Sequence, residues 1–173
     1  MDKYSYKNRK YDVAPYDTKW VDQFEEYKSK TQKIFPEAQI EHIGSTSVPG
    51  MAGKPCIDLL VIVEDLKIAE KHIGDMEKVG FEDAGEFVME NSRLFRVMKD
   101  DTLFANVHFF PAGHPHNDEM LNLRDYLRSH PEEVKAYSKH KEELYSKYQD
   151  DYASYRKYKD EYMDELKLRV NKQ

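Results

Sequence analysis

The sequence has a single cysteine, Cys56, among 173 residues. One thiol excludes an intrachain disulfide and a multi-cysteine metal site, and it fits a reducing compartment. No apolar run approaches the roughly 18 residues that a membrane span needs, so none is predicted. The basic segment 1–11 is not followed by an apolar stretch, so no signal peptide is expected and the cytoplasm is the expected location.

Positive charge is also in deficit. The chain has 27 Lys and Arg against 33 Asp and Glu, a net charge of −6. This balance argues against a general nucleic-acid binder but leaves room for a local basic cleft. The length fits a single domain over residues 1–173.

Hydrophobic spacing predicts a mixed α/β order. Between 17 and 35, apolar residues recur three and four positions apart, which predicts a helix that Asp17 caps and Pro36 ends. A further helix is predicted between 66 and 80. Alternating or β-branched runs predict four strands, of which the last two form a hairpin: 39–43, 56–63, 93–98 and 103–110.

The chain from residue 117 to residue 170 is predicted to be helical. Asn117 or Asp118 is expected to cap the first helix, and Ser129 with Glu132 has the spacing of a capping box for the next. Seven tyrosines fall between 137 and 162 at helical spacing. Their acidic neighbours favour packing over stacking on nucleic-acid bases.

The segment 44–58 has the strongest chemical signal. A Gly-Ser-Thr-Ser loop follows the first strand, and glycine lets the backbone approach a ligand while hydroxyls and amides suit a phosphate. Asp58 then interrupts an apolar strand, where a carboxylate is costly unless it is paired or faces a cleft. Mg²⁺ is a fitting partner because it takes oxygen ligands and shares them with phosphates.

A plainer interpretation stays open for the same segment. Gly44–Gly50 can be only a polar turn, since such turns are common. Asp58 can be tied to a backbone amide or to Lys54.

The segment 42–61, HIGSTSVPGMAGKPCIDLLV, resembles the signature block of the GrpB family, a branch of the nucleotidyltransferase-fold superfamily. The likeness continues at YDTKW (16–20), NVHF (106–109) and LRDYLRSHP (123–131). The resemblance implies an α/β (α+β) fold, a small mixed β-sheet flanked by helices. The core is expected over 16–110, with added C-terminal helices over 117–170. Fusions of this family to dephospho-coenzyme A kinases suggest a coenzyme A-related ligand.

The resemblance also implies a metal triad, from which this sequence departs. The superfamily pattern has a Gly-Ser pair, two carboxylates at i and i+2 of a strand, and a third on a neighbouring strand. Gly44 and Ser45 match the pair and Asp58 matches the first carboxylate, but Leu60 stands at the second. Asn106 and His108 occur where the third is expected. A single Mg²⁺ held by Asp58 with His108 and phosphate oxygens is the expectation, rather than two ions.

Further basic and hydroxyl residues are expected to bind phosphate. Arg93 and Arg96 are three apart on a strand and face opposite ways, so only one can line a cleft. Surface ion pairing is the alternative for any single arginine. The predicted phosphate-binding or nucleotide-binding residues are His42, Gly44, Ser45, Thr46, Ser47, Lys54, Arg124 and Arg128, with Asp58 and His108 as catalytic residues.

Two other chemistries are weaker. His108 with His114 and His116 could bind zinc, but His-Pro-His lies in a predicted loop without helical ligand spacing. Ser45 and Ser47 lack the strand–turn–helix setting of a hydrolase nucleophile.

Two functions of different class follow. One is an enzyme that transfers a nucleotidyl or phosphoryl group from a nucleoside triphosphate with Mg²⁺, with Asp58 as the metal ligand. The other is a non-catalytic module that binds a nucleotide, a phosphorylated small molecule or a coenzyme A-related ligand. Neither a membrane nor a nucleic acid is expected as a partner.

Overall fold

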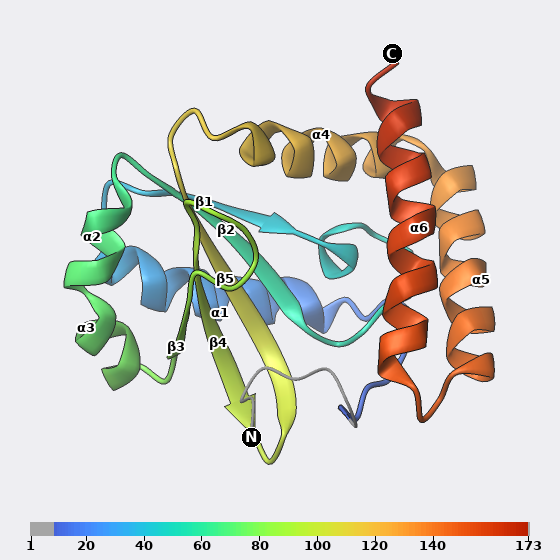
Figure 1. Cartoon of the computed structure of the whole chain (residues 1–173), viewed down its shortest axis with the longest axis horizontal. Coiled ribbons are helices and arrows are strands. Elements are labelled where there is room, and N and C mark those ends of the chain that lie inside the picture. Colours follow the sequence, from blue (N-terminus) through green and yellow to red (C-terminus); the bar gives the residue numbers. More distant parts are fainter. Residues whose placement is uncertain (1–8, 173) are drawn as a thin grey trace.

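The computed structural model describes residues 9–172, which form a five-stranded sheet with helices on both faces (Figure 1). The strand order is β1-β2-β5-β4-β3. β2 and β5 are parallel, and the other neighbours are antiparallel, so the sheet is mixed. The strands are β1 Gln39–Ile43, β2 Ile57–Val63, β3 Glu82–Gly85, β4 Arg93–Lys99 and β5 Thr102–Pro111.

The helices fall into two groups along the chain. The helices of the first group precede the strands or lie between them in the sequence. The second group consists of three long helices that follow the last strand. Their bounds are α1 Lys19–Ile34, η1 (a single 3₁₀ turn) Ser45–Ser47, α2 Leu66–Lys71, α3 Ile73–Lys78, α4 Pro115–Ser129, α5 Pro131–Lys147 and α6 Tyr152–Val170.

One face of the sheet carries the main apolar core. Because side chains alternate along a strand, Leu59 and Val61 of β2 point to the same side as Val107 of β5. They pack with Trp20 and Phe24 of α1, all nearly fully buried. This packing fixes the opposite set of β2 side chains, which includes Asp58, toward the other face.

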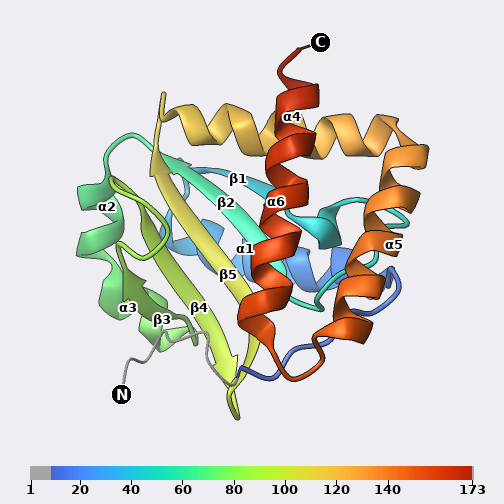
Figure 2. The same ribbon diagram turned by 45° about the vertical axis from the view of Figure 1, so that its right-hand side comes forward.

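That other face turns toward the C-terminal helices. Figure 2 shows α6 crossing in front of the sheet, with α1 behind it and α4 running along one end to α5. Two small apolar clusters hold the helices in place. Met51 and Val48 of the loop after β1 pack with Leu127, Val134 and Leu166 of the three helices. Leu60 packs with Ile43 and Phe110.

The predicted fold class is confirmed: the sheet is small and mixed, helices flank it, and helices follow it. The predicted strand 39–43 has the bounds of β1. The predicted helix 66–80 is instead two short helices, because the backbone at His72 leaves helical geometry.

Three predicted helix caps are wrong. The N-cap of α1 is Thr18 and not Asp17, although the Asp17 carboxylate accepts from the backbone amide of Lys19. The other two are in the C-terminal part. α4 begins after His114, whose ring accepts from the backbone amide of His116, while Asn117 is inside the helix and donates to the carbonyl of Pro111. α5 begins after His130 with no side-chain cap. Ser129 does not form a capping box, because its hydroxyl donates to carbonyls of α4.

No helix within residues 9–172 is long and apolar enough to cross a bilayer.

Candidate functional site

Asp58 is held by two side chains of the neighbouring parallel strand. The amide of Asn106 donates to Asp58 Oδ1 at 3.0 Å, and His108 Nε2 lies 3.4 Å from the same oxygen. Burial favours a raised pKa, but the hydrogen bonds from His108 and Asn106, with the charges of His108 and Lys54, outweigh it and lower the pKa of Asp58. The Asp58 side chain is 26% exposed, so its ionised carboxylate still faces open space.

The second oxygen of Asp58 faces the loop after β1. Gly44 has a φ of +73°, and a Cβ built on it would lie 2.6 Å from Asp58 Oδ2. Only glycine allows both the backbone conformation and this approach. Within the described chain, no hydrogen-bond donor contacts Oδ2, so this oxygen is available to a ligand beside the Gly44–Ser45 backbone.

Position 60 has no access to this site. Leu60 is fully buried with Ile43 and Phe110 under α4. Residues 9–172 contain no group of three His, Cys, Asp or Glu that could hold a metal ion. The donor set therefore does not fit a pair of ions, which needs shared carboxylates. One Mg²⁺ that shares phosphate oxygens with Asp58 is chemically compatible, since Mg²⁺ in such sites uses few protein ligands.

Lys141 of α5 also contacts the loop after β1. Its Nζ donates to Ser45 Oγ at 2.8 Å and lies 4.4 Å from the centre of the Tyr137 ring. The side chain is 1% exposed. No carboxylate of residues 9–172 pairs with it. Burial, with the charges of Lys159 and Lys54, lowers the pKa of Lys141 to about 7.

Asp58, Ser45 and Lys141 line one cavity of about 300 Å³ between the sheet and the last two helices. We call this cavity the cationic cleft. It has two acidic side chains, and one of them, Asp160, is already paired with Lys159 at 2.8 Å and with Arg156 at 3.2 Å. Six basic side chains line it: Arg9, Lys54, Arg96, Lys141, Arg156 and Lys159.

The structure places three of the eight predicted phosphate-binding residues in the cleft and the other five outside it. Gly44, Ser45 and Lys54 line it beside Asp58 and His108. Lys54 Nζ donates to the hydroxyl of Tyr152 at 2.5 Å.

His42, Thr46 and Ser47 do not line the cleft. His42 stacks on Phe24 on the α1 side, with ring centres 4.4 Å apart, and its Nε2 bonds to Thr46 Oγ1 at 2.9 Å. Burial, reinforced by Arg128 and Arg124 and opposed by Asp58, lowers the pKa of His42 to about 4, so the ring is neutral. Ser47 donates its hydroxyl to the carbonyl of Gly44 at 2.6 Å. These side chains therefore stabilise the loop after β1 through contacts outside the cleft.

Arg124 and Arg128 of α4 bond to the protein itself. Arg124 pairs with Glu41 at 2.8 Å and donates to the carbonyl of His42 at 3.2 Å. Arg128 donates to the carbonyl of Ser47 at 2.9 Å. Arg124 thus contacts β1 and Arg128 the loop after it, and neither lines the cationic cleft.

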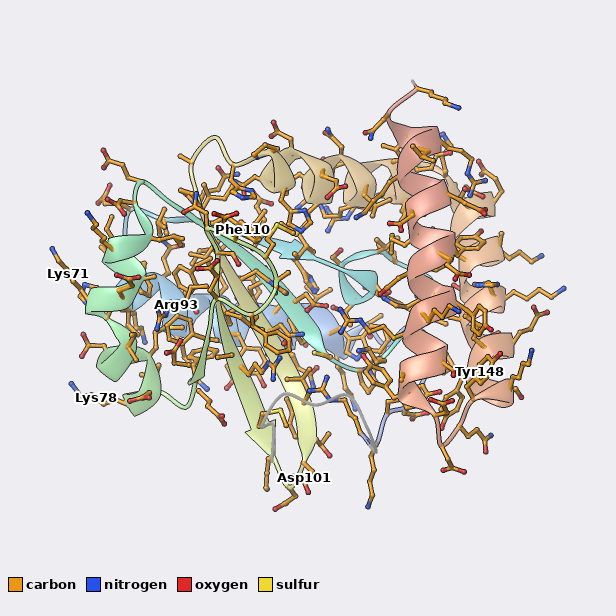
Figure 3. The ribbon with its side chains drawn as sticks, in the orientation of Figure 1. Lys71, Lys78, Arg93, Asp101, Phe110 and Tyr148 are labelled. Atoms are coloured by element: carbon orange, nitrogen blue, oxygen red, sulfur yellow. The ribbon has the colours of Figure 1, made fainter. Side chains whose placement is uncertain are left out.

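The two arginines of β4 face opposite ways, as the strand period predicts. Arg93 lies on the side of α2 and α3, where it pairs with Asp83 at 2.7 Å (Figure 3). Arg96 is aligned with Asn106 of β5 and lines the cleft, with its guanidinium 4.3 Å from the Phe87 ring centre.

The sequence reasoning missed Lys141, Lys159 and Arg156 as site residues. A signal for Lys141 was present, because it falls on the apolar stripe of its helix between Tyr137 and Leu144. A lysine in such a stripe is rarely buried without a reason. Arg156 and Lys159 have no comparable signal, since they sit among many charged residues of α6.

Comparison with solved structures places the fold. A crystal structure of the conserved protein GrpB from Enterococcus faecalis has a TM-score of 0.87 at 32% identity, covering 93% of this chain and 98% of that one. The Cid1 poly(U) polymerase with MgGTP bound has a TM-score of 0.56 at 16% identity, over 79% of this chain and 45% of that one. The second likeness shows a nucleotidyltransferase-like fold and nothing of the activity.

Proteins related in sequence include further members of the same family. The UPF0157 protein YqkA of Bacillus subtilis is 35% identical over 147 residues, which are 84% of this chain and 43% of that protein. The chain thus spans less than half of that relative. The glutamate-rich protein GrpB of Alkalihalophilus pseudofirmus is 29% identical, over 85% of this chain and 88% of that protein. The profile of the GrpB protein family matches residues 10–169. The chain therefore belongs to the GrpB family.

Proposed function

We propose that this protein binds a nucleotide or another phosphorylated small molecule, with its phosphate groups in the cationic cleft. The observation that carries this is Lys141. Lys141 is 1% exposed, its amine donates to Ser45, and no carboxylate of residues 9–172 pairs with it. The charged form of a buried amine is costly without a counter-ion, and an anion bound beside the amine would supply one.

A phosphate supplies the counter-ion that Lys141 lacks. Lys54 and Arg96 line the same cavity, and the hydroxyl of Ser45 lies beside the lysine amine. Charge-assisted hydrogen bonds from lysine and arginine to phosphate are short and strong. Gly44 is exposed and lines the same cavity, so its backbone can approach a ligand, as glycine-containing phosphate-binding loops do.

One Mg²⁺ fits between Asp58 and the bound phosphate oxygens. Asp58 Oδ2 would hold it, and the ion would neutralise phosphate charge next to the carboxylate. Without such an ion, Asp58 repels the phosphate that the cations attract. We therefore expect nucleoside di- and triphosphates to bind more tightly when Mg²⁺ is present.

Isothermal titration calorimetry with ATP, ADP, pyrophosphate, inorganic phosphate and coenzyme A tests the proposal. Lys141→Met should weaken binding about 10- to 100-fold, as expected for the loss of a hydrogen bond to a charged group. Lys139→Met is the matched control, because Lys139 is on the same helix with a side chain 76% exposed. Equal affinity in the wild type and Lys141→Met, or no binding across the panel, overturns the proposal.

Transfer of a nucleotidyl or phosphoryl group is the second candidate function. Its support is the free oxygen of Asp58 beside the Gly44–Ser45 loop, on a nucleotidyltransferase-like fold. Labelled nucleoside triphosphates, Mg²⁺ and a metabolite pool should then release pyrophosphate or give a labelled product, and Asp58→Asn should abolish this. Binding without turnover favours the non-catalytic module, in which Leu60 marks the lost carboxylate.

A further inference from the structure

A second cavity of about 260 Å³ lies beside the cationic cleft, between the sheet and the helices α4 and α6. Its walls are largely apolar. Met120, Leu123 and Leu127 come from α4, Met163 from α6, and Met51 from the loop after η1. We call it the methionine pocket. Methionine adapts its shape to different apolar groups, so such walls suit a flexible apolar guest.

The two cavities meet at the centre of the candidate site. Gly44, Ser45, Asp58 and His108 line both of them. Lys141 Nζ is 2.8 Å from Ser45 Oγ, so a phosphate on Lys141 lies at the junction. One molecule can therefore occupy the cationic cleft with its phosphate and the methionine pocket with another part.

We call the charged groups that α4 and α6 contribute to the methionine pocket its rim, and these groups have partners within the protein. Lys167 and His116 line the pocket, and Glu119 pairs with them at 3.3 Å and 2.6 Å. Arg124 is 2.8 Å from Glu41. This rim contrasts with the cationic cleft, where basic side chains outnumber acidic ones. Apolar walls with charge satisfied at the rim select an uncharged, apolar group.

We propose that the phosphorylated ligand carries an apolar substituent, an aliphatic chain or an aromatic ring, which binds in the methionine pocket. This inference rests on the proposed phosphate site and adds the chemical class of the rest of the ligand. The phosphate binds at Lys141 and Ser45, the chain passes Gly44 and His108, and its end packs on Met120 and Leu123.

A series of n-alkyl phosphates tests this on the full chain. Inorganic phosphate and methyl, butyl and hexyl phosphate are titrated by calorimetry. Burial of each methylene should tighten binding about fourfold until the pocket is filled. If hexyl phosphate binds no more tightly than methyl phosphate, the methionine pocket is not the site of an apolar substituent. If none of the four binds, the phosphate site itself fails, and this inference fails with it.

Variants on α4 locate the effect. Met120→Trp fills the pocket and should remove the dependence on chain length while methyl phosphate binds as before. Met120→Gln changes the volume little and should reduce the gain per methylene, which covers the case that the larger side chain prevents folding. Asn122→Trp is the control, since Asn122 is exposed on the same helix. Chain-length dependence that persists unchanged in both Met120 variants overturns the assignment.

Discussion

Gly44 and Asp58 are so close that a single added methyl group would separate the loop from the strand. A Cβ on Gly44 would lie 2.6 Å from Asp58 Oδ2, at a backbone φ of +73°. Gly44→Ala should therefore lower the free energy of unfolding by about 2 kcal/mol or more, because a non-glycine residue in this backbone conformation costs about 1–3 kcal/mol and the clash adds to that cost. Urea denaturation followed by circular dichroism measures this.

Gly74→Ala is the control for that substitution. Gly74 lies within α3, and a Cβ there has nothing within 4 Å. Alanine should stabilise the helix by about 0.5–1 kcal/mol. Equal effects of the two substitutions would mean that the loop is not held against Asp58.

Lys141 should make stability depend on pH near neutrality. Its pKa is about 7 in the folded chain and 10.5 ordinarily. Between these values the unfolded chain binds more protons, so the free energy of unfolding rises with pH by up to about 1.4 kcal/mol per unit. Lys141→Met should flatten the curve between pH 7 and pH 9, relative to Lys139→Met, in urea titrations. Parallel curves would show that Lys141 keeps its proton in the folded chain.

Phosphate binding should take up a proton at pH 8. An anion beside Lys141 favours the charged amine and raises its pKa again, because opposite charges stabilise each other in a poorly solvated site. Calorimetry in two buffers of different ionisation enthalpy measures the number of protons exchanged. The uptake should be absent in Lys141→Met if residual binding remains measurable, and uptake of the same size in that variant would assign it to another group.

Arg128 should matter for stability more than for affinity. Its Nε donates to the carbonyl of Ser47 at 2.9 Å, and it does not line the cationic cleft. Arg128→Gln should cost about 1 kcal/mol of stability through the lost bond. Its phosphate affinity should fall far less than that of Lys141→Met. A loss as large as that of Lys141→Met would place the phosphate on the α4 side of the loop instead.

The fold was largely predictable because its signals are local. The alternation at 39–43 and the apolar run before Val63 each define a strand, and Pro36 marks the end of α1 closely. The break between α2 and α3 at His72 was not predictable, because the apolar spacing of Ala69 and Met76 continues across it. Helix starts at His114 and His130 were missed because histidine is not a residue from which a cap is expected.

The candidate site was predictable where it follows from strand period. Asp58 faces the cleft because its neighbours Ile57 and Leu59 face the core. For His42, the strand period does not say which face of the sheet the side chain is on. Both faces of β1 are covered, and His42 is on the face that packs on α1. The burial of Lys141 has a local signal in the apolar stripe of α5. The position of α5 and α6 beside the sheet has none, because it depends on packing between segments far apart in the chain.

The separation of the site residues along the chain has a consequence for folding during translation. Ser45 and Asp58 emerge early in translation, whereas Lys141, Lys159 and Met163 arrive with α5 and α6. A nascent chain can pair its strands well before it can recognise any ligand. Binding competence should thus appear in one step, when the helix ending at Val170 clears the ribosome and docks.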